Sequence, residues 1–357
     1  MEIISYTTSI RDKWDEFVCC HDYAWVGHHS AIFELEKEFG NENISLVVID
    51  DKQKIIGIMP LFFRIRKVKN IIPIQKSIVS GSSLRSGSLF ADALSEKQQD
   101  KALDLLMSKI MELGHSLKVD DITIAYPIMH GDKTSLEHFG YFPLKRYGFK
   151  ENNLVTMVKD LRFDEQTLFS SLRHNCRKNI RRCIEEGGEF INIVDRSQWM
   201  SCYDLNVQTF NTNFTKPYTL KTMEILWDSF VANGLAEITA IRLNNKIISV
   251  LVTAVMKKSY YAWIGFNSKP APIPGANNLL TWKTMLYHKQ KGVEFFEIGS
   301  REFSNTKQVN ISAYKESFQG SDSYSLSGSL ILSPLKMLML KTLKSYLLAY
   351  FTVKSSS

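Results

Sequence analysis

Residues 259–299 read SYYAWIGFNSKPAPIPGANNLLTWKTMLYHKQKGVEFFEIG. The stretch opens with an apolar, aromatic run through Phe266, which is typical of a β-strand. A loop rich in proline, residues 270–275, follows it. Apolar residues then recur on one helical face within residues 279–286, and residues 293–298 form a second short apolar run. The stretch therefore predicts a strand, a loop, a helix and a second strand.

The start of this helix is a candidate anion site. Asn277 or Asn278 is a suitable N-cap, and Gly275 comes just before them. The first backbone N–H groups of a helix have no partners within the helix, and they favour a bound anion such as a pyrophosphate.

Two further motifs carry a family resemblance. Residues 296–299 read FEIG, and residues 314–320 read YKESFQG. The order of strand, helix entry, helix and closing motifs resembles that of GNAT-fold acyltransferases, above all the FemAB-type peptidoglycan aminoacyltransferases and the CelD-like N-acyltransferases. Their closing motifs read roughly D-F-G-G and F-K-x-x-F-G-G, whereas this chain has Glu297, Tyr314 and Gln319 at three of those positions. The resemblance extends to about residue 325.

The resemblance implies an α/β (α+β) fold of tandem GNAT-like domains, each a mixed, mainly antiparallel sheet flanked by helices. It implies acyl transfer from a thioester to an amine, with acyl-CoA (acetyl-CoA or longer) as co-substrate and no metal. The R/Q-x-x-G-x-G/A loop of standard GNAT enzymes does not occur in residues 270–278. The residues that the resemblance assigns to the donor are Tyr261, Trp263, Gly265, Gly275, Ala276, Asn277 and Asn278.

Three residues are candidates for the chemical step. Lys315 occupies the position of the motif lysine that the family uses near the reacting carbonyl, and a fixed positive charge there suits a forming oxyanion. Tyr314 precedes it. Glu297, at a strand end, is the candidate general base. The alternatives are a surface lysine for Lys315 and a structural carboxylate for Glu297.

A basic helix is predicted for residues 166–186. Its cations form two adjacent stripes, and like charges one turn apart repel each other unless an anion binds between them. In the resembled family a helix of the form S-x-x-x-R-x-N-I-R-R joins the two halves, and residues 171–182 fit that form. The candidate substrate-binding residues are Arg177, Lys178 and Arg181, and the alternative is a solvated face.

The chain repeats itself at an offset near 190 residues. Trp14 corresponds to Trp199, and Lys54 corresponds to Lys246. We therefore expect an N-terminal GNAT-like domain at residues 1–160, a connecting helix at 161–189, a C-terminal GNAT-like domain with the donor site at 190–325, and a basic amphipathic tail at 326–357.

Composition sets broad limits. The chain has 357 residues, with 44% hydrophobic and 23% charged residues, which is ordinary for a globular protein. The net charge of +7 favours anionic partners. Five cysteines without zinc spacing, and the lack of a signal peptide at the start of the sequence, predict reduced thiols and a cytoplasmic location.

The tail predicts one of two contacts. It packs on the body, or it lies at the inner face of the membrane as a peripheral contact. The predicted function is an N-acyltransferase that uses acyl-CoA and an amine acceptor, an amino sugar or related precursor in surface-glycan or lipid assembly. The alternatives are a FemAB-type enzyme with aminoacyl-tRNA as donor and, in another class, a nucleic-acid-binding protein that uses the Arg173–Arg182 helix.

Overall fold

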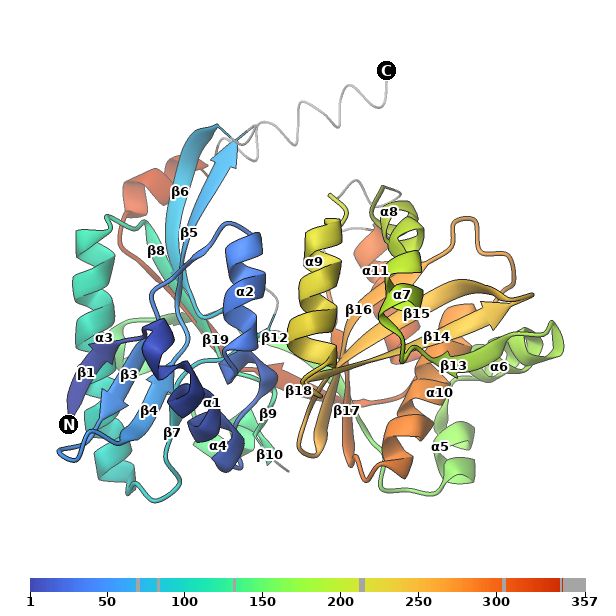
Figure 1. The fold of residues 1–357 in the computed structure, drawn as a ribbon, viewed down its shortest axis with the longest axis horizontal. Coiled ribbons are helices and arrows are strands. Elements are labelled where there is room, and N and C mark those ends of the chain that lie inside the picture. The colour runs from blue at the N-terminus through green and yellow to red at the C-terminus, as the bar shows by residue number, and fades with distance from the viewer. Residues whose placement is uncertain are drawn as a thin grey trace.

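Two α/β halves lie side by side and face each other along helices α2 and α9 (Figure 1). The computed structural model describes residues 1–68, 71–81, 84–130, 133–211, 216–303, 306–340 and 342. Secondary structure and contacts below refer to these residues.

The N-terminal half contains short strands and four α-helices. The strands are β1 (Glu2–Ser5), β2 (Glu42–Asn43), β3 (Leu46–Ile49), β4 (Ile55–Met59), β5 (Phe62–Val68), β6 (Ile72–Val79), β7 (Leu89–Phe90), β8 (Asp121–Ala125), β9 (Met129–His130), β10 (Lys133–Thr134) and β11 (Lys150–Glu151). The α-helices that flank them are α1 (Arg11–Cys20), α2 (Ala31–Glu38) and α3 (Glu96–Ser116), with the short α4 (Ser135–Phe139) and 3-10 turns η1 (Thr8–Ile10), η2 (Val26–His28) and η3 (Lys145–Tyr147).

The C-terminal half is built on longer strands. These are β12 (Leu154–Asp160), β13 (Glu189–Asn192), β14 (Ala236–Leu243), β15 (Lys246–Met256), β16 (Ser259–Asn267), β17 (Phe295–Ser300) and β18 (Ser321–Ser325). The last strand of the chain, β19 (Ser327–Ile331), returns to a sheet of the N-terminal half. Its helices are α5 (Glu165–Ser171), α6 (His174–Glu185), α7 (Arg196–Ser201), α8 (Tyr203–Asn211), α9 (Leu220–Ile225), the π-helical η4 (Leu226–Val231), α10 (Ala276–Gln290) and α11 (Thr306–Glu316).

The sheets are mixed and mainly antiparallel, as predicted. The C-terminal half has one seven-stranded sheet in the order β13-β14-β15-β16-β17-β12-β18. The N-terminal half divides its strands between a four-stranded sheet, β1-β3-β4-β7, and a six-stranded sheet, β11-β19-β8-β6-β5-β2. Each half contains one parallel pair, β6 with β8 and β16 with β17.

The predicted repeat falls on equivalent elements. Trp14 in α1 and Trp199 in α7 are both fully buried, and their indole N–H groups donate to the backbone oxygens of His28 and Met223 at 2.7 and 2.8 Å. Lys54 immediately precedes β4 and Lys246 opens β15, each the second strand of an antiparallel hairpin. The tandem α/β fold is therefore confirmed.

The chain crosses between the halves twice. β12, which the expected boundary at residue 160 placed in the first half, pairs with β17 and β18 of the C-terminal sheet. β19, in the expected tail, pairs with β8 and β11 of the N-terminal half. The boundaries at 160, 189 and 325 stay a prediction, and residues 341 and 343–357 of the tail lie outside the described residues.

The continuous helix predicted for residues 166–186 is wrong, because the structure has two helices there. Leu172 takes an extended backbone conformation between α5 and α6, with ψ of 149°. The N–H of Arg173 donates to the backbone oxygen of Ser317 at 2.9 Å, outside the helix. Helical periodicity continues across the break, so the sequence pattern did not reveal it.

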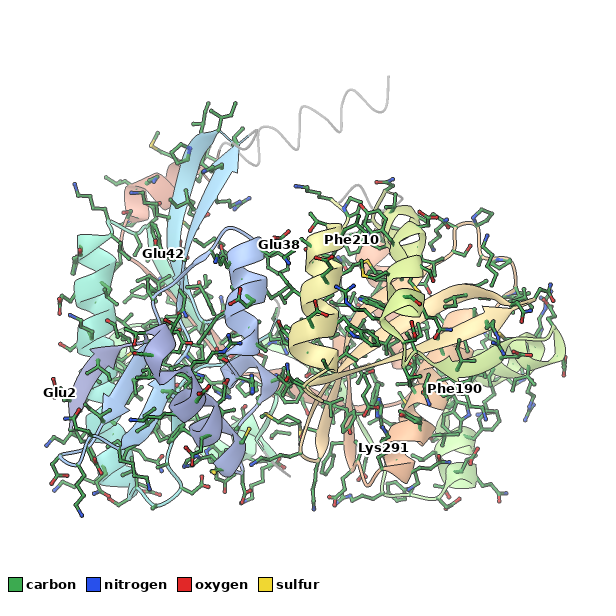
Figure 2. The ribbon with its side chains drawn as sticks, in the orientation of Figure 1. Glu2, Glu38, Glu42, Phe190, Phe210 and Lys291 are labelled. Carbon is green, nitrogen blue, oxygen red and sulfur yellow. The ribbon has the colours of Figure 1, made fainter. Side chains whose placement is uncertain are left out.

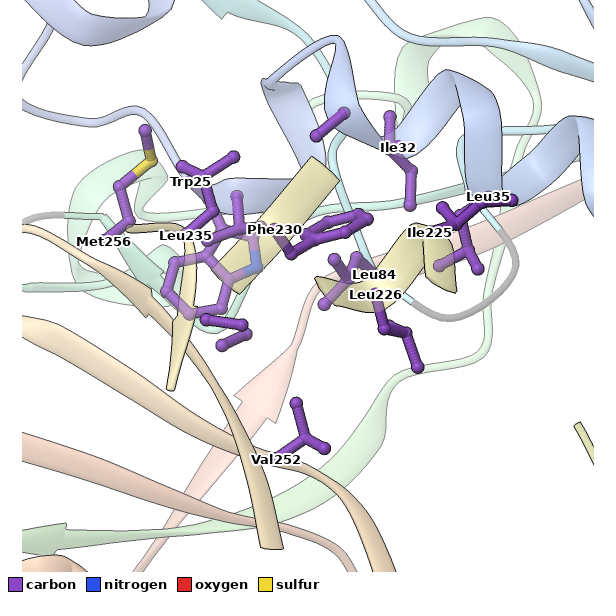
Figure 3. Close-up of a cluster of buried hydrophobic side chains, with 14 of the residues drawn as sticks. Trp25, Ile32, Leu35, Leu84, Ile225, Leu226, Phe230, Leu235, Val252 and Met256 are labelled. Atoms are coloured by element: carbon purple, nitrogen blue, oxygen red, sulfur yellow. The ribbon is translucent and has the colours of Figure 1, made fainter. Parts of the chain in front are cut away.

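The two halves share one apolar core. Trp25, Ile32 and Leu35 from the first half pack in the same buried cluster as Leu226 and Phe230 from the second (Figure 3). At the rim of this contact the Thr219 hydroxyl donates to Glu38 Oε1 at 2.7 Å, and Figure 2 shows Glu38 at the boundary between the halves. Because buried side chains of both halves belong to this one apolar cluster, the cluster holds the halves in a fixed relative position.

Phe230→Ala tests this shared core. The ring is fully buried, so its removal leaves a cavity, and we expect the free energy of unfolding to fall by about 3–5 kcal/mol. Denaturant unfolding followed by tryptophan fluorescence measures the change. Phe163→Ala is the control, because Phe163 is 55% exposed. Equal, small losses in both variants would contradict a shared core.

Candidate active site

The site lies where two parallel strands separate. β16 and β17 pair at only three positions, the last of which joins Tyr261 to Glu297. Beyond that point the strands diverge, while β17 remains paired with β12, its neighbour on the opposite edge, as far as Ser300. A pocket of about 670 Å³ occupies the region between them, with walls from β15, β16, α10 and α11.

β16 supplies one wall of this pocket. Tyr261, Trp263 and Gly265 alternate along the strand and line the pocket. The ring of Trp263 lies 5.2 Å from that of Phe230, so the wall is packed against the shared core. Burial raises the pKa of the Tyr261 hydroxyl to about 12, with a further contribution from the nearby Glu297 carboxylate.

The start of α10 forms the next wall. Gly275 has φ of +79°, and a Cβ there would lie 2.2 Å from the backbone oxygen of Asn179, so only glycine lets α10 approach α6 this closely. Asn277 Oδ1 accepts from the Ser249 hydroxyl at 2.8 Å. Ala276 and Asn278 are buried against the same contact.

A smaller pocket of about 170 Å³ continues the first along the helix start. Residues 275–278 line it, and Asn267, Lys269, Asn277 and Tyr314 line both pockets. The structure therefore brings the seven predicted donor residues to one connected surface, which runs from β16 to the unbonded amides at the start of α10.

α11 supplies Tyr314 and Lys315. The Tyr314 hydroxyl lies 2.8 Å from the Thr281 hydroxyl and 3.0 Å from the backbone oxygen of Asn277, which it can only donate to. Burial raises the pKa of this hydroxyl well above its usual value. Tyr314 therefore fixes α11 to the first turns of α10.

Lys315 sits at the end of β17. Its Nζ donates to the backbone oxygen of Ser300 at 2.6 Å, and a Cβ at Gly299 would lie only 3.0 Å from that nitrogen. Burial lowers the pKa of the ammonium below its usual value, and the carboxylates of Glu297 and Glu302 oppose this shift. Lys315 lines the larger pocket, so the structure places a partly desolvated cation where the strands diverge.

Glu297 is buried beside the pocket and has two partners. Its Oε1 accepts from the Thr156 hydroxyl at 2.8 Å and from Arg85 Nη1 at 3.2 Å. The other guanidinium nitrogen of Arg85 donates to the Ser300 hydroxyl at 3.0 Å. A carboxylate held this way favours the structural alternative, and its role as general base stays a prediction.

Arg85 is the site residue that sequence reasoning missed. It belongs to the loop after β6, in the other half of the chain, 212 positions from Glu297. The arginine stands in a stretch rich in serine and glycine that carries no motif pointing to a site. Its backbone oxygen lies so close to Gly27 that a Cβ at that glycine would come within 2.3 Å, so the loop packs tightly on η2.

The predicted substrate-binding residues lie on α6, away from both pockets. Arg177 donates to the backbone oxygens of Ser170 and Leu172 and so caps the C-terminal end of α5. The guanidinium of Arg181 lies 5.5 Å from the ring centre of Phe169, and Lys178 is exposed. Substrate binding by Arg177, Lys178 and Arg181 stays a prediction.

Other partners reduce the free charge of this helix. Arg173 pairs with Glu316 at 3.0 Å, and Arg182 pairs with Glu186 at 2.6 Å. A nucleic-acid surface needs cations that are free to meet phosphates, so these contacts disfavour that alternative. Within the described residues, no group of three or more potential metal ligands occurs.

Arg85→Met tests the ion pair between the halves. Loss of the guanidinium leaves the Glu297 carboxylate buried and unpaired, and we expect the free energy of unfolding to fall by roughly 3 kcal/mol. Arg196→Met is the matched control, because its pair with Asp228 is exposed and is expected to contribute about 0–1 kcal/mol. Chemical denaturation measures both. Equal stability of the two variants would show that the Arg85 contact does not form in solution.

Comparison with known proteins agrees with this geometry. Residues 170–316 match the acetyltransferase (GNAT) domain family. No curated protein matches the chain in sequence. Among solved structures, FemX has a TM-score of 0.69 and 16% identity, over 95% of this chain and 99% of that chain.

Two other solved structures share the whole fold. L-PGS from Bacillus licheniformis has a TM-score of 0.59 and 11% identity, over 94% of this chain and 96% of that chain. A tandem GNAT protein from the clavulanic acid biosynthesis pathway has a TM-score of 0.53 and 10% identity, over 92% and 98%. Residues 170–316 therefore form a GNAT acetyltransferase domain, and nearly the full length of the chain has the tandem fold of FemX and of the tandem GNAT protein.

Proposed function

We propose that this enzyme transfers an acyl group from acyl-CoA, acetyl or longer, to an amine acceptor, an amino sugar or a related precursor in surface-glycan or lipid assembly. One observation carries the proposal: the pocket between the diverging strands continues to the start of α10 and contains Lys315. A long, flexible thioester donor fits such a connected surface, with its acyl end at β17 and its pyrophosphate at the helix start.

The donor is proposed to bind along β16. Diverging strands leave backbone N–H and C=O groups of residues 262–267 without partners from β17, and these groups suit an amide-containing pantetheine arm. Residues 275–278 then receive the pyrophosphate, and Lys269, which lines both pockets, adds a positive charge nearby.

The chemical step is direct attack. The lone pair of the acceptor amine forms a bond to the thioester carbon, the carbonyl oxygen gains negative charge, and the C–S bond then breaks to release the thiolate. The Lys315 ammonium stabilises that oxyanion. Its position beside Gly299 and Ser300 leaves it close to the diverging strand ends, where the thioester would lie.

The remaining candidates have different proposed roles. Glu297 is proposed as the acceptor of the amine proton, and its contacts with Arg85 and Thr156 also support a role in fixing β17. Tyr314 is proposed to position Lys315, because its hydroxyl ties α11 to α10. Glu297→Gln separates the two roles of the carboxylate: a base is lost, whereas the hydrogen bonds to the side chain remain.

The acceptor is proposed to carry an anionic part that meets Arg177, Lys178 and Arg181 of α6. The names of FemX and of L-PGS do not identify an acceptor for this chain. We propose that the enzyme acts in the cytoplasm and meets such acceptors at the inner face of the membrane. No helix in the described part of the chain is long and apolar enough to span a bilayer.

Lys315→Met tests the proposed charge. The change keeps much of the stem and removes the ammonium, so kcat and kcat/KM should fall together by about 10²–10³ while donor affinity stays near that of the unmodified enzyme. Lys246→Met, an exposed lysine at the start of β15, is the control. Full activity of Lys315→Met would end the proposal.

The pH profile gives an independent check of the same residue. Burial lowers the pKa of Lys315, so the ammonium loses its proton at a lower pH than an exposed lysine does. If the charged form is required, kcat should decline as the pH rises through that lowered pKa, and Lys315→Met should abolish this limb. A profile that is flat over the alkaline range would contradict the role.

The donor is tested by binding. A thermal-shift screen should show a higher melting temperature with acetyl-CoA or a longer acyl-CoA, because a ligand of the native state stabilises it. Gly275→Ala is the matched variant. Its added Cβ would clash with the backbone oxygen of Asn179 and would prevent the close contact of α10 with α6 at the proposed pyrophosphate site. A shift with aminoacyl-tRNA alone would instead identify the FemAB-type donor.

A further inference from the structure

A β-hairpin projects from the N-terminal half and carries exposed apolar side chains. β5 and β6 pair from Phe62 with Val79 to Val68 with Ile72, and the hairpin extends past the neighbouring helices (Figure 1). Near its tip Ile71 is 78% exposed and Ile72 is 61% exposed. Two adjacent aliphatic side chains at such exposure form an apolar patch, and apolar patches mark interaction sites more often than single exposed residues do.

The same hairpin is cationic. Residues 64–76 contain five lysines and arginines, at positions 64, 66, 67, 69 and 76, and neither aspartate nor glutamate. Arg66 and Lys67 are exposed and adjoin the apolar tip. Arg66 Nη1 donates to Gln75 Oε1 at 3.3 Å, so within the described residues no carboxylate neutralises it.

A second apolar stripe adjoins the base of the hairpin. Leu335, Leu338 and Met339 lie on one face of the helical segment at residues 334–340, and all three are exposed. This segment is tied to β6 through Asp120, whose Oδ2 accepts from Lys336 Nζ at 2.7 Å and from the backbone N–H of Lys76 at 2.8 Å. Figure 1 shows the short red helix beside β6 at the same end of the molecule.

The shape and the charge of the β5–β6 hairpin together indicate which kind of surface covers it. The apolar groups stand on a projecting tip rather than in a groove, so they suit insertion into a soft interface more than packing against a preformed protein surface. Cations around an apolar tip match the layered chemistry of a bilayer, whose phosphate head groups lie above its hydrocarbon. A second copy of this chain would bring the same positive charge to the contact, and repulsion would oppose it.

We propose that the β5–β6 hairpin is a docking surface for an anionic lipid bilayer. Ile71 and Ile72 enter the interface, and Arg66 and Lys67 contact the head-group phosphates. The surface belongs to the N-terminal half and does not depend on the acyl-transfer chemistry of the pocket on the C-terminal half.

Vesicle flotation with the full chain tests this surface. We expect the chain to float with vesicles of phosphatidylcholine mixed with phosphatidylglycerol, and much less with phosphatidylcholine alone. Ile71→Ser with Ile72→Ser should lower the partition coefficient about tenfold or more, since two buried aliphatic side chains are lost. The matched control is Val194→Ser with Ile184→Ser, two exposed aliphatic residues elsewhere, and it should bind as the unmodified chain does.

A charge series completes the test. Arg66→Gln with Lys67→Gln should lower binding by about fivefold for each charge removed, with a smaller effect at high salt. Lys13→Gln with Lys52→Gln, two exposed lysines elsewhere, is the control. Unchanged melting temperatures show that each variant is folded.

Three results would overturn the proposal. The first is an unmodified chain that does not float with anionic vesicles. The second is a hairpin variant that floats as well as its control, which would place the contact elsewhere on the chain. The third is sedimentation showing that Ile71→Ser with Ile72→Ser abolishes a dimer, which would identify a second copy as the partner.

Discussion

The parallel pairing of β16 and β17 ends after three positions, and the proposed acyl-transfer site depends on that ending. Two fully paired strands would leave no backbone groups for a donor and no pocket between them. β17 stays ordered because β12, its neighbour on the opposite edge, pairs with it from Phe295 to Ser300, past the point where the pairing with β16 ends. Lys315 lies at the same point, with its Nζ bonded to Ser300, the last residue of β17. The pocket, the donor wall and the proposed catalytic charge therefore follow from one local loss of pairing.

Contacts from the N-terminal half hold this open arrangement in place. The core around Phe230 joins the halves, and Trp263, which lines the pocket, packs against the same ring. Arg85 adds a polar connection, because one guanidinium bonds both Glu297 and Ser300. Pairs of charges that are partly desolvated are costly to leave unpaired, so a small displacement of the halves is opposed at β17 itself. The N-terminal half thus acts on the site without supplying its donor wall.

The sequence was sufficient where the signal is local. The proline-rich loop at residues 270–275 and the helical periodicity after it located β16, α10 and β17. The repeated tryptophans, Trp14 and Trp199, indicated the tandem fold. It was insufficient where the signal is a long-range contact. The pairing of Arg85 with Glu297 leaves no periodic trace, and the break at Leu172 is stabilised by an amide that bonds Ser317 rather than by any helix-breaking residue.

The repeat also explains why one half keeps a site. The N-terminal counterparts are β6, α3 and β8, and β6 pairs in parallel with β8 at three positions, as β16 does with β17. There the ends are closed: the Ser80 hydroxyl accepts from the N–H of Ala125, and the N–H of Ser86 donates to the oxygen of Ala125. The closing loop carries Arg85 between these serines and directs it to Glu297. The loop that bonds to the end of β8 in the N-terminal half therefore also supports β17 in the C-terminal half. In this way the duplicated fold keeps the strand ends open at β16 and β17, where we propose that the donor binds.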